Sequence, residues 1–326
     1  MSDHNLLTIG LAQIAPIWMD RERTLAKVVS YVEEARRQGC HLVAFGEALV
    51  PGYPFWLGLT GGAQFNAPLQ KTIFAEYATA AVQVEAGHLE SLRATALRHH
   101  IAVYLGCVER PTDRGSHSLY CSLVYIDQGG VIRSIHRKLM PTYEERLVWS
   151  TGDGHGLATH PLRAFRVGGL SCWENWMPLP RAALYAQSED LHVAVWPGSL
   201  HNTVDITRFV ALESRSFVAS VSGLMRREDI GEGAGWRDVV GAASPSLLAS
   251  GGSCIAGPDG EWVVPPAPPV ETLLVATIDH RRVLEERQNF DPSGHYARPD
   301  VTRLTVDRKR QSVLVQDALS PAGPPN

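Results

Sequence analysis

Cys172 is the residue of this chain whose type and surroundings most directly suggest chemistry. It lies in the segment GLSCWEN (169–175), after an apolar, β-prone run over 164–170 and before the break at Pro178. A thiol at the end of a strand can be held rigidly by the sheet and still be reached by a substrate in the adjoining loop. Because a thiolate is a strong nucleophile, this position suggests covalent catalysis.

Three charged residues at or near the ends of earlier apolar segments could complete such a site. Glu47 closes the segment VAFGE, Lys138 closes the segment IHRK, and Glu145 follows a short way after the lysine. A carboxylate at the end of a buried strand can act as a general base, because burial raises its pKa toward neutrality. A lysine near a thiol favours the thiolate and can stabilise negative charge that develops on a substrate.

Each of these residues also has an ordinary structural interpretation. A cysteine is often a small core residue, so Cys172 taken alone could be structural. Glu47 and Lys138 could form an ion pair with no catalytic role, and Glu145 could belong to an exposed charged turn. The residue types and their places at strand ends therefore suggest the site without deciding between the two interpretations.

The elements that must position these residues alternate between strands and helices. Hydrophobic periodicity predicts an amphipathic helix over 21–37 and a second helical stretch over 61–98, broken near Gly87. The predicted strands cover 6–15, 41–48, 101–108, 119–126, 131–139, 162–172, 191–196, 218–222, 253–264 (a hairpin) and 273–278, and further helices cover 180–187, 205–217 and 281–287. Buried strands that alternate with helices indicate one α/β domain, a mixed sheet covered by helices.

Composition and charge exclude several functional classes. With 44% hydrophobic and 20% charged residues, the 326-residue chain can bury a large core, and a net charge of −4 without a basic run argues against a nucleic-acid partner. The N-terminus lacks the features of a signal peptide, and no apolar stretch reaches the length of a membrane span. Five widely spaced cysteines favour reduced thiols and a cytoplasmic location. The chain has no His-Glu-x-x-His motif or tight Cys/His cluster, so we expect no metal site.

Three motifs together resemble the signatures of the nitrilase (carbon–nitrogen hydrolase) superfamily, and the similarity runs from about residue 6 to residue 305. They are FGE (45–47) with the PGYP that follows it, RKLMPT (137–142) and CWEN (172–175). By this resemblance Glu47 is the general base, Lys138 the charge-stabilising cation, Cys172 the nucleophile, and Glu145 the residue that orients the lysine and the substrate. It also implies a four-layer αββα sandwich that pairs into αββα–αββα dimers and, in larger assemblies, into spirals.

The segments after the nucleophile resemble the branch of the superfamily that acts on nitriles. They are MPL (177–179) and FDPSGHYARPD (290–300), whereas amidase-type members usually continue differently after the cysteine. Pro180 departs from the leucine usual in this branch, although proline suits the first turn of a helix. The predicted domain covers residues 1–305, and the Pro/Gly/Ala-rich end indicates a short, partly disordered tail over 306–326.

The resemblance predicts a nitrilase that needs no cofactor and hydrolyses a small organic nitrile to the carboxylic acid and ammonia. Glu47 would take the thiol proton and Cys172 would attack the nitrile carbon, with thioimidate and thioester intermediates. The alternatives are an amidase or carbamoyl-amide hydrolase, a cyanide dihydratase, and an inactive filament-forming scaffold. Residues predicted to line the substrate pocket, each of which could instead fill the core or an interface, are Tyr53, Trp56, Trp173, Trp176, Trp196 and His201.

Overall fold

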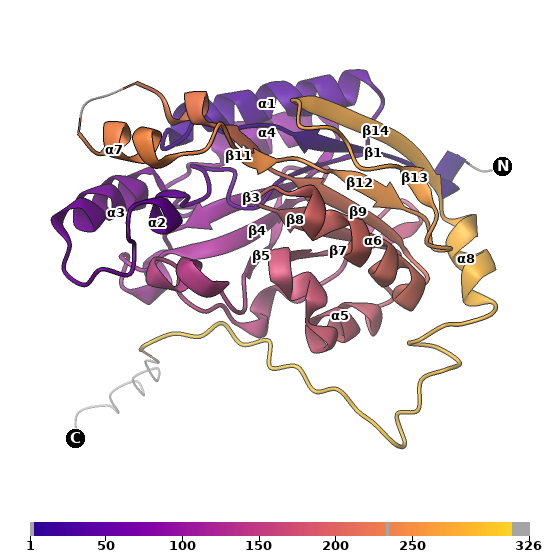
Figure 1. The fold of residues 1–326 in the computed structure, drawn as a ribbon. Coiled ribbons are helices and arrows are strands. Elements are labelled where there is room, and N and C mark those ends of the chain that lie inside the picture. The colour runs from indigo at the N-terminus through magenta and orange to yellow at the C-terminus, as the bar shows by residue number, and fades with distance from the viewer. Residues whose placement is uncertain (1–2, 233–234, 315–326) are drawn as a thin grey trace, which may run out of the picture.

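Two six-stranded sheets packed face to face form the centre of the molecule (Figure 1). The computed structural model describes residues 3–232 and 235–314. The first sheet has the order β14 (Thr272–Asp279), β1 (Leu6–Gln13), β2 (Leu42–Phe45), β3 (Ala102–Glu109), β4 (Tyr120–Ile126) and β5 (Ile132–Arg137). The second has the order β13 (Trp262–Val264), β12 (Cys254–Ala256), β9 (Phe217–Ser222), β8 (Leu191–Trp196), β7 (Phe165–Ser171) and β6 (His160–Leu162). The strands β1–β2–β3 and β7–β8–β9 run parallel, and the outer pairs are antiparallel.

Helices cover the outer face of each sheet. The helices α1 (Arg21–Arg37) and α4 (Glu90–His99) lie on the first sheet, and α5 (Pro178–Tyr185) and α6 (Leu200–Ser214) lie on the second (Figure 1). The layers therefore follow the order αββα, which confirms the architecture predicted from the resemblance. The remaining named helices and strands are α2 (Trp56–Leu59), α3 (Pro68–Ala80), α7 (Trp236–Ala243), α8 (Arg281–Arg287), β10 (Leu224–Arg226) and β11 (Leu247–Ser250).

Successive side chains of a strand point to opposite faces of the sheet, and each face is covered by another layer. In β8, Leu191, Val193 and Val195 point into the core between the two sheets. Trp196, on the opposite face of the same strand, packs against residues of α6. Parallel strands covered on both faces read as nearly continuous apolar runs, which is the pattern that the sequence shows in these segments.

Element boundaries differ from the prediction where capping decides them. The helix predicted over 205–217 begins at Leu200, because the Ser199 hydroxyl accepts a hydrogen bond from the backbone N–H two residues later (3.2 Å). The helix predicted over 180–187 begins at Pro178, since proline at the first helical position loses no hydrogen bond. The β10–β11 pair and α7 lie in a part of the chain where no element was predicted.

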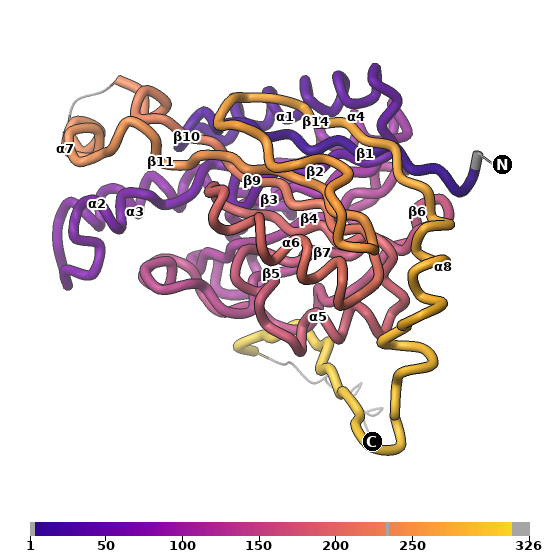
Figure 2. Tube along the Cα trace, turned by 45° about the vertical axis from the view of Figure 1, so that its right-hand side comes forward, coloured from indigo at the N-terminus to yellow at the C-terminus, as the bar shows by residue number. Residues whose placement is uncertain are grey.

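The chain after α8 runs away from the body and returns to the edge of the first sheet (Figure 2). There Arg310 donates hydrogen bonds to Asp153 Oδ1 (2.9 Å) and to the Ile135 carbonyl of β5 (2.9 Å). This part of the predicted tail is therefore docked on the domain, whereas residues 320–326, predicted to be disordered, lie outside the described residues. Within the described part of the chain, no helix combines the length and the apolar character needed to cross a membrane.

Candidate active site

The loops that follow β2, β5 and β7 meet at one place beside the two sheets. Glu47 lies two residues after β2, Lys138 directly follows β5, and Cys172 directly follows β7 and opens a short 3-10 helix. The Glu47 N–H donates to the Trp196 carbonyl at the end of β8 (3.2 Å). This hydrogen bond joins the Glu47 loop of the first sheet to the second sheet next to the site.

A lysine ammonium group bridges two carboxylates at the centre of the site. Lys138 Nζ donates to Glu47 Oε1 (2.8 Å) and to Glu145 Oε2 (2.7 Å). A carboxylate oxygen of each glutamate and the sulfur of Cys172 all lie within 4.8 Å of one another. All four residues are at most 3% exposed. The structure thus brings together the four predicted catalytic residues, and the cation that the two carboxylates hold is the lysine ammonium group.

Burial and neighbouring charges set the protonation of this group. Burial raises the pKa of Glu47 to about 7 and Glu145 adds to the rise, whereas Lys138 and the Cys121 thiol lower it. Glu47 Oε1 accepts from both Lys138 and Cys121 (3.4 Å), while Oε2 has no partner among the described residues. Burial alone would lower the pKa of Lys138, but Glu47, Cys172 and Glu145 raise it above its usual value. Glu47 can therefore accept a proton near neutral pH beside a cation that stays charged.

Cys172 lies at a sharp turn from strand to helix. Its backbone has a left-handed φ of 52°, which is uncommon for a residue with a side chain. Burial and Glu47 raise the pKa of its thiol, whereas Lys138 and the Trp173 backbone N–H lower it. Because burial prevails, the resting thiol keeps its proton and needs an adjacent base to become a nucleophile. The arrangement can supply that base and can stabilise negative charge formed next to the sulfur.

Aromatic side chains fix the second carboxylate. The Tyr53 hydroxyl donates to Glu145 Oε1 (2.8 Å), and the Tyr53 ring packs edge-on against Trp149 with 5.6 Å between ring centroids. The Trp149 ring in turn lies 5.7 Å from Lys138 Nζ, a cation–π contact. A small cavity of about 10 Å³ adjoins these groups and is lined by residues that include Glu47, Tyr53, Phe55, Pro197, Gly223 and Met225.

Comparison with known proteins identifies the family. The sequence model described as "Carbon-nitrogen hydrolase" matches residues 8–288. The chain belongs to the carbon–nitrogen hydrolase family. Among its relatives in this family, "Nitrilase 2" from an unknown prokaryotic organism is 35% identical over 97% of this chain and 98% of the relative. An "Aliphatic nitrilase" of Sinorhizobium fredii (strain HH103) is 35% identical over 95% and 98%, and one of Rhodococcus rhodochrous is 32% identical over 93% and 80%.

Solved structures of carbon–nitrogen hydrolases share the fold. The structure of a carbon-nitrogen hydrolase from Helicobacter pylori G27 matches with a TM-score of 0.66 at 18% identity, over 90% of this chain and 96% of that one. An amidase from Nesterenkonia sp. matches with a TM-score of 0.63 at 18% identity, over 87% and 94%. At this level of identity the likeness concerns the fold, and it supports the αββα sandwich described above.

The six residues predicted to line the substrate pocket of this carbon–nitrogen hydrolase lie in different surroundings. Tyr53 contacts the candidate catalytic group through Glu145. Trp56 and Trp196 are completely buried within hydrophobic clusters. The other three are exposed, namely Trp173 (48%), Trp176 (44%) and His201. Contact with substrate stays a prediction for all six.

Besides Trp149, two other buried residues of the site were not singled out from the sequence. One is Cys121, whose position inside an apolar strand carries no signal of function. The other is Glu174, which lies within the CWEN motif and links the lysine loop to the cysteine loop. Its carboxylate accepts from the backbone N–H of Leu139 (2.6 Å) and of Ser171 (3.1 Å), the neighbours of the lysine and the cysteine in sequence. His136 Nε2 lies 3.2 Å from both of its oxygens, so the link is fully buried and charge-assisted.

We predict that Glu174→Gln destabilises the protein and misplaces the two loops. A glutamine amide has one acceptor oxygen, so its NH₂ group would face one of the two backbone donors. The free energy of unfolding should fall by roughly 2–4 kcal/mol, the cost of an unsatisfied buried partner of a charged group. Chemical denaturation of both proteins at neutral pH measures this change.

The matched control is Glu22→Gln, which makes the same change on a side chain that is 87% exposed and should leave stability nearly unaltered.

Burial raises the pKa of Glu174, but His136 and the backbone donors outweigh it, so the net pKa lies below 4.5. The stabilising contribution of Glu174 is therefore complete above about pH 4.5 and is lost as the pH falls through the lower folded-state pKa. Equal stability of the Glu174→Gln and Glu22→Gln proteins would rule out a stabilising role for the Glu174 carboxylate.

Proposed function

We propose that this carbon–nitrogen hydrolase is a nitrilase that converts an organic nitrile and two water molecules to the carboxylic acid and ammonia. The observation that carries the proposal is the buried lysine ammonium group between two carboxylates, with the Cys172 sulfur within 4.8 Å of both. A thiol, a base with a pKa of about 7 and a fixed cation are what covalent attack on an uncharged carbon–nitrogen bond requires.

The proposed reaction begins when Glu47 accepts the Cys172 proton on Oε2, the oxygen that has no partner among the described residues. The sulfur then forms a bond to the nitrile carbon, and the nitrogen takes up the negative charge beside Lys138 and the Trp173 N–H before protonation yields a thioimidate. Water activated by Glu47 adds to that carbon, and ammonia leaves, so that a thioester remains. A second water cleaves the thioester, which releases the acid and restores the thiol.

Sequence relatives favour nitriles over amides as the substrate class. Three relatives named nitrilases are 32–35% identical over at least 93% of this chain, whereas the amidase with a solved structure is 18% identical. Within the site, we propose that Tyr53 and Trp173 contact the substrate, because Tyr53 touches Glu145 and Trp173 follows the nucleophile. Both would present aromatic surface to the organic part of the nitrile.

Ammonia release from matched nitriles and amides tests this function. A panel of aliphatic, aryl and arylaceto nitriles is incubated with the protein, and each acid and its amide are quantified beside ammonia. A nitrilase forms acid and ammonia in equal amounts from at least one nitrile. Turnover of the amides alone would assign the protein to the amidases, and turnover of free cyanide alone would make it a cyanide dihydratase.

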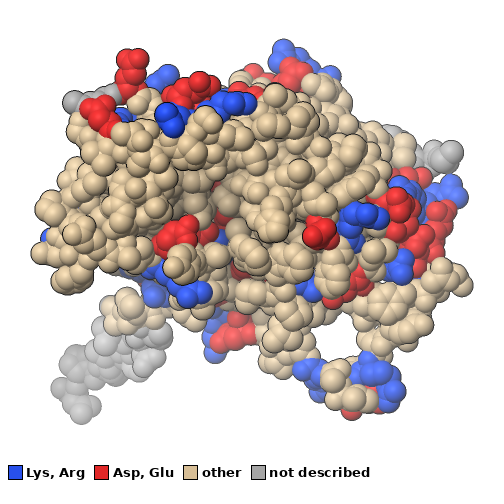
Figure 3. All heavy atoms as spheres, in the orientation of Figure 1, with Lys and Arg blue, Asp and Glu red and all other residues tan. Residues whose placement is uncertain are grey.

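We further propose that two copies pair through an apolar surface over α5, α6 and the short helix that begins at Cys172. We call it the α5–α6 surface. Figure 3 shows few charged atoms over the middle of this face. Trp176 and Phe209 stack there with ring centroids 6.5 Å apart. Large exposed apolar patches mark interaction sites on soluble proteins. The exposed apolar residues of the surface are Trp173, Trp176, Met177, Leu179, Phe209 and Leu212, which are 36–65% exposed.

We predict that Phe209→Glu converts the dimer to a monomer. A charge at this stack would lose its water on pairing, and the nearest cation, Arg181, is already paired with Glu213 (2.8 Å), so the burial costs several kcal/mol. Sedimentation velocity at micromolar concentration compares the variant with the unmodified protein. Leu97→Glu, on α4 in the opposite outer layer, places the same charge on another exposed apolar position (51% exposed) and should leave the assembly unchanged. An unmodified protein that sediments as a monomer would exclude the interface.

We infer a cytoplasmic location from the state of the cysteines. All five are free and buried in the structure. Reduced thiols persist in the cytosol, and a catalytic thiol is protected there from stable oxidation. Fractionation of cells that produce the protein would place it in the periplasmic or secreted fraction if this inference is wrong.

A further inference from the structure

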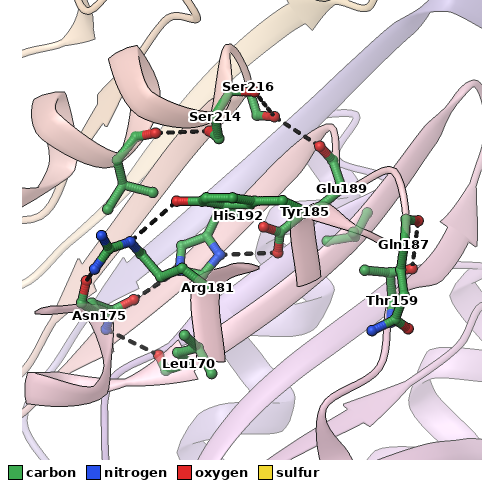
Figure 4. A network of polar contacts seen from close by, with 12 residues as sticks. Thr159, Leu170, Asn175, Arg181, Tyr185, Gln187, Glu189, His192, Ser214 and Ser216 are labelled. Atoms are coloured by element: carbon green, nitrogen blue, oxygen red, sulfur yellow. Dashed lines mark hydrogen bonds and ion pairs between the residues drawn. The ribbon is translucent and has the colours of Figure 1, made fainter. Parts of the chain in front are cut away.

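A chain of buried polar side chains lies behind the nucleophile, on the side of the second sheet that faces α5 (Figure 4). It begins at Asn175, passes through His192 of β8 and ends at Glu189. Each of the three residues has no exposed surface. None of them takes part in the proton transfers proposed above, yet burying polar groups in place of apolar ones is costly unless their hydrogen bonds are needed.

The first link holds the backbone of the nucleophile itself. Asn175 Nδ2 donates to the Cys172 carbonyl oxygen at 2.8 Å and lies 3.4 Å from the carbonyl oxygen of Leu170. The Cys172 residue is the one with the left-handed φ of 52°. Because that conformation is strained for a residue with a side chain, surrounding contacts must hold it in place. The asparagine amide is such a contact, and it acts on the residue that carries the reacting sulfur.

The second link fixes the orientation of the asparagine. Since both carbonyl oxygens are acceptors only, the NH₂ group must face them, and Asn175 Oδ1 must face His192 Nε2, which lies 2.7 Å away. His192 Nε2 must therefore carry a hydrogen and donate it. A histidine that accepted at this nitrogen would favour the flipped amide, with its oxygen against the Cys172 carbonyl.

The third link fixes the histidine. His192 Nδ1 lies 2.9 Å from Glu189 Oε1, so a single proton is held between the two groups, on the imidazole or on the carboxyl. Gly168 of β7 leaves space for this carboxyl group, because a Cβ there would lie 2.1 Å from Glu189 Oε1. Glu189 is further held through its backbone carbonyl, which accepts from Ser216 Oγ (2.7 Å).

We propose that Glu189, His192 and Asn175 form a positioning chain that sets the backbone of Cys172 and thereby the place of its sulfur relative to Glu47 and Lys138. Asn175 and His192 are positioning residues, because they touch neither the substrate nor the reacting atoms. The inference rests on the proposed function of Cys172 as the nucleophile. A small misplacement of a reacting group can reduce turnover about 100-fold without a matching loss of substrate binding.

Two substitutions of His192 distinguish two roles of this residue: orienting the Asn175 amide, and giving the buried Glu189 carboxyl group a hydrogen-bond partner. In His192→Gln the side-chain amide nitrogen can reach the position of Nε2 and still donate to Asn175. In His192→Asn the shorter amide matches Nδ1, so it can still donate to Glu189 but leaves Asn175 without its donor. The proposal predicts that kcat of His192→Asn falls about 10- to 100-fold with KM nearly unchanged, whereas His192→Gln stays within about threefold of the unmodified protein.

Asn175→Asp provides a second, nearly isosteric test. Its carboxylate can still accept from His192 but has no hydrogen to donate to the Cys172 carbonyl, so kcat should fall as in His192→Asn. The rate at which iodoacetamide alkylates Cys172, with loss of iodide, should fall in parallel in both variants. A folded Asn175→Asp protein with unchanged kcat and alkylation rate would overturn the proposal, as would a His192→Asn protein that is at least as active as His192→Gln.

A measurement on the unmodified protein covers the case in which the variants do not fold. Nitrogen-15 NMR of histidine-labelled protein should show His192 with a hydrogen on Nε2, and an unprotonated Nε2 would contradict the proposal. Cys172→Ala separates this inference from the proposed function. If that variant still hydrolyses nitriles, the proposed function fails first, whereas an inactive Cys172→Ala protein beside fully active Asn175→Asp rejects the positioning chain alone.

Discussion

Cys172→Ala is expected to abolish nitrile hydrolysis while leaving the fold intact. The side chain is 2% exposed and contributes one sulfur atom to a small cluster beneath α6, so its removal leaves only a minor void. Without the sulfur, no covalent intermediate can form, and the remaining carboxylates and lysine have no nucleophile to activate. Loss of a covalent nucleophile typically lowers kcat on the order of 10⁶-fold, which places the residual rate below detection in an ammonia assay.

Trapping of the intermediate makes this prediction specific for the thiol. An acid quench during turnover of the unmodified protein should give an intact mass increased by the acyl group, and peptide mapping should place the adduct on Cys172. The matched control is Cys121→Ala, which removes another buried sulfur, one that lies 3.4 Å from Glu47 Oε1. That variant should keep most of its activity and form the same adduct. Residual nitrile turnover by Cys172→Ala, or an adduct on another residue, would refute the scheme.

The four catalytic candidates could be predicted from the sequence because of where they occur. Glu47, Lys138 and Cys172 each follow an apolar segment, and strand ends in layered α/β folds are where functional loops gather. The motif resemblance then placed Glu145 with them. What it could not supply is the electrostatics, because the pKa of Glu47 depends on its complete burial and on the distance to Lys138, neither of which sequence spacing determines.

The residues that surround the candidate catalytic group were harder to predict, because their partners are distant in sequence or hidden in apolar runs. His192 lies within the strand LHVAVW, where alternation alone indicates only that its side chain faces away from the inner core. Its partner Asn175 lies in a different element, and nothing in their sequence separation brings the two together. Cys121 likewise reads as a small core residue until β4 is placed beside the Glu47 loop.

The αββα order of layers followed from the motif resemblance, whereas the strand and helix pattern alone indicated one mixed sheet instead of the two sheets that are present. Short elements were the hardest part of the fold to predict. Long amphipathic or apolar segments such as α1 and β8 stand out because their periodicity extends over many residues. In contrast, β10 covers only Leu224–Arg226, and its partner β11 follows only after the intervening helix α7. Pairs of this kind depend on tertiary contacts, here the packing of Trp236 against Trp18 (5.8 Å between ring centroids), and leave little local signal.

Glu47→Gln is expected to lower kcat/KM by about 10²- to 10⁴-fold, the usual contribution of a general base. The amide is nearly the same size as the carboxyl, and its oxygen can still accept from Lys138, so the change removes the proton acceptor and little else. Because burial holds the pKa of Glu47 near 7, the unmodified enzyme should lose kcat/KM about tenfold per pH unit below that value, as Glu47 becomes protonated. Initial rates of ammonia release between pH 5 and pH 9, a range of about two units on either side, measure both effects.

Stability measurements separate this loss from misfolding. A carboxyl with a raised folded-state pKa favours folding only at acidic pH, and this contribution is lost as the pH rises through about 7. At pH 8 the folded protein must hold the Glu47 carboxylate buried and charged, and Glu47→Gln removes this charge. The variant should therefore resist denaturant at pH 8 at least as well as the unmodified protein, although it has lost its activity.

In the control Cys121→Ala, the thiol hydrogen bond that lowers the pKa of Glu47 is gone, so the acid limb of the pH profile should move to higher pH with turnover retained. An acid limb that stays in place in Cys121→Ala, or a Glu47→Gln enzyme that keeps a tenth of the activity, would mean that another group accepts the thiol proton.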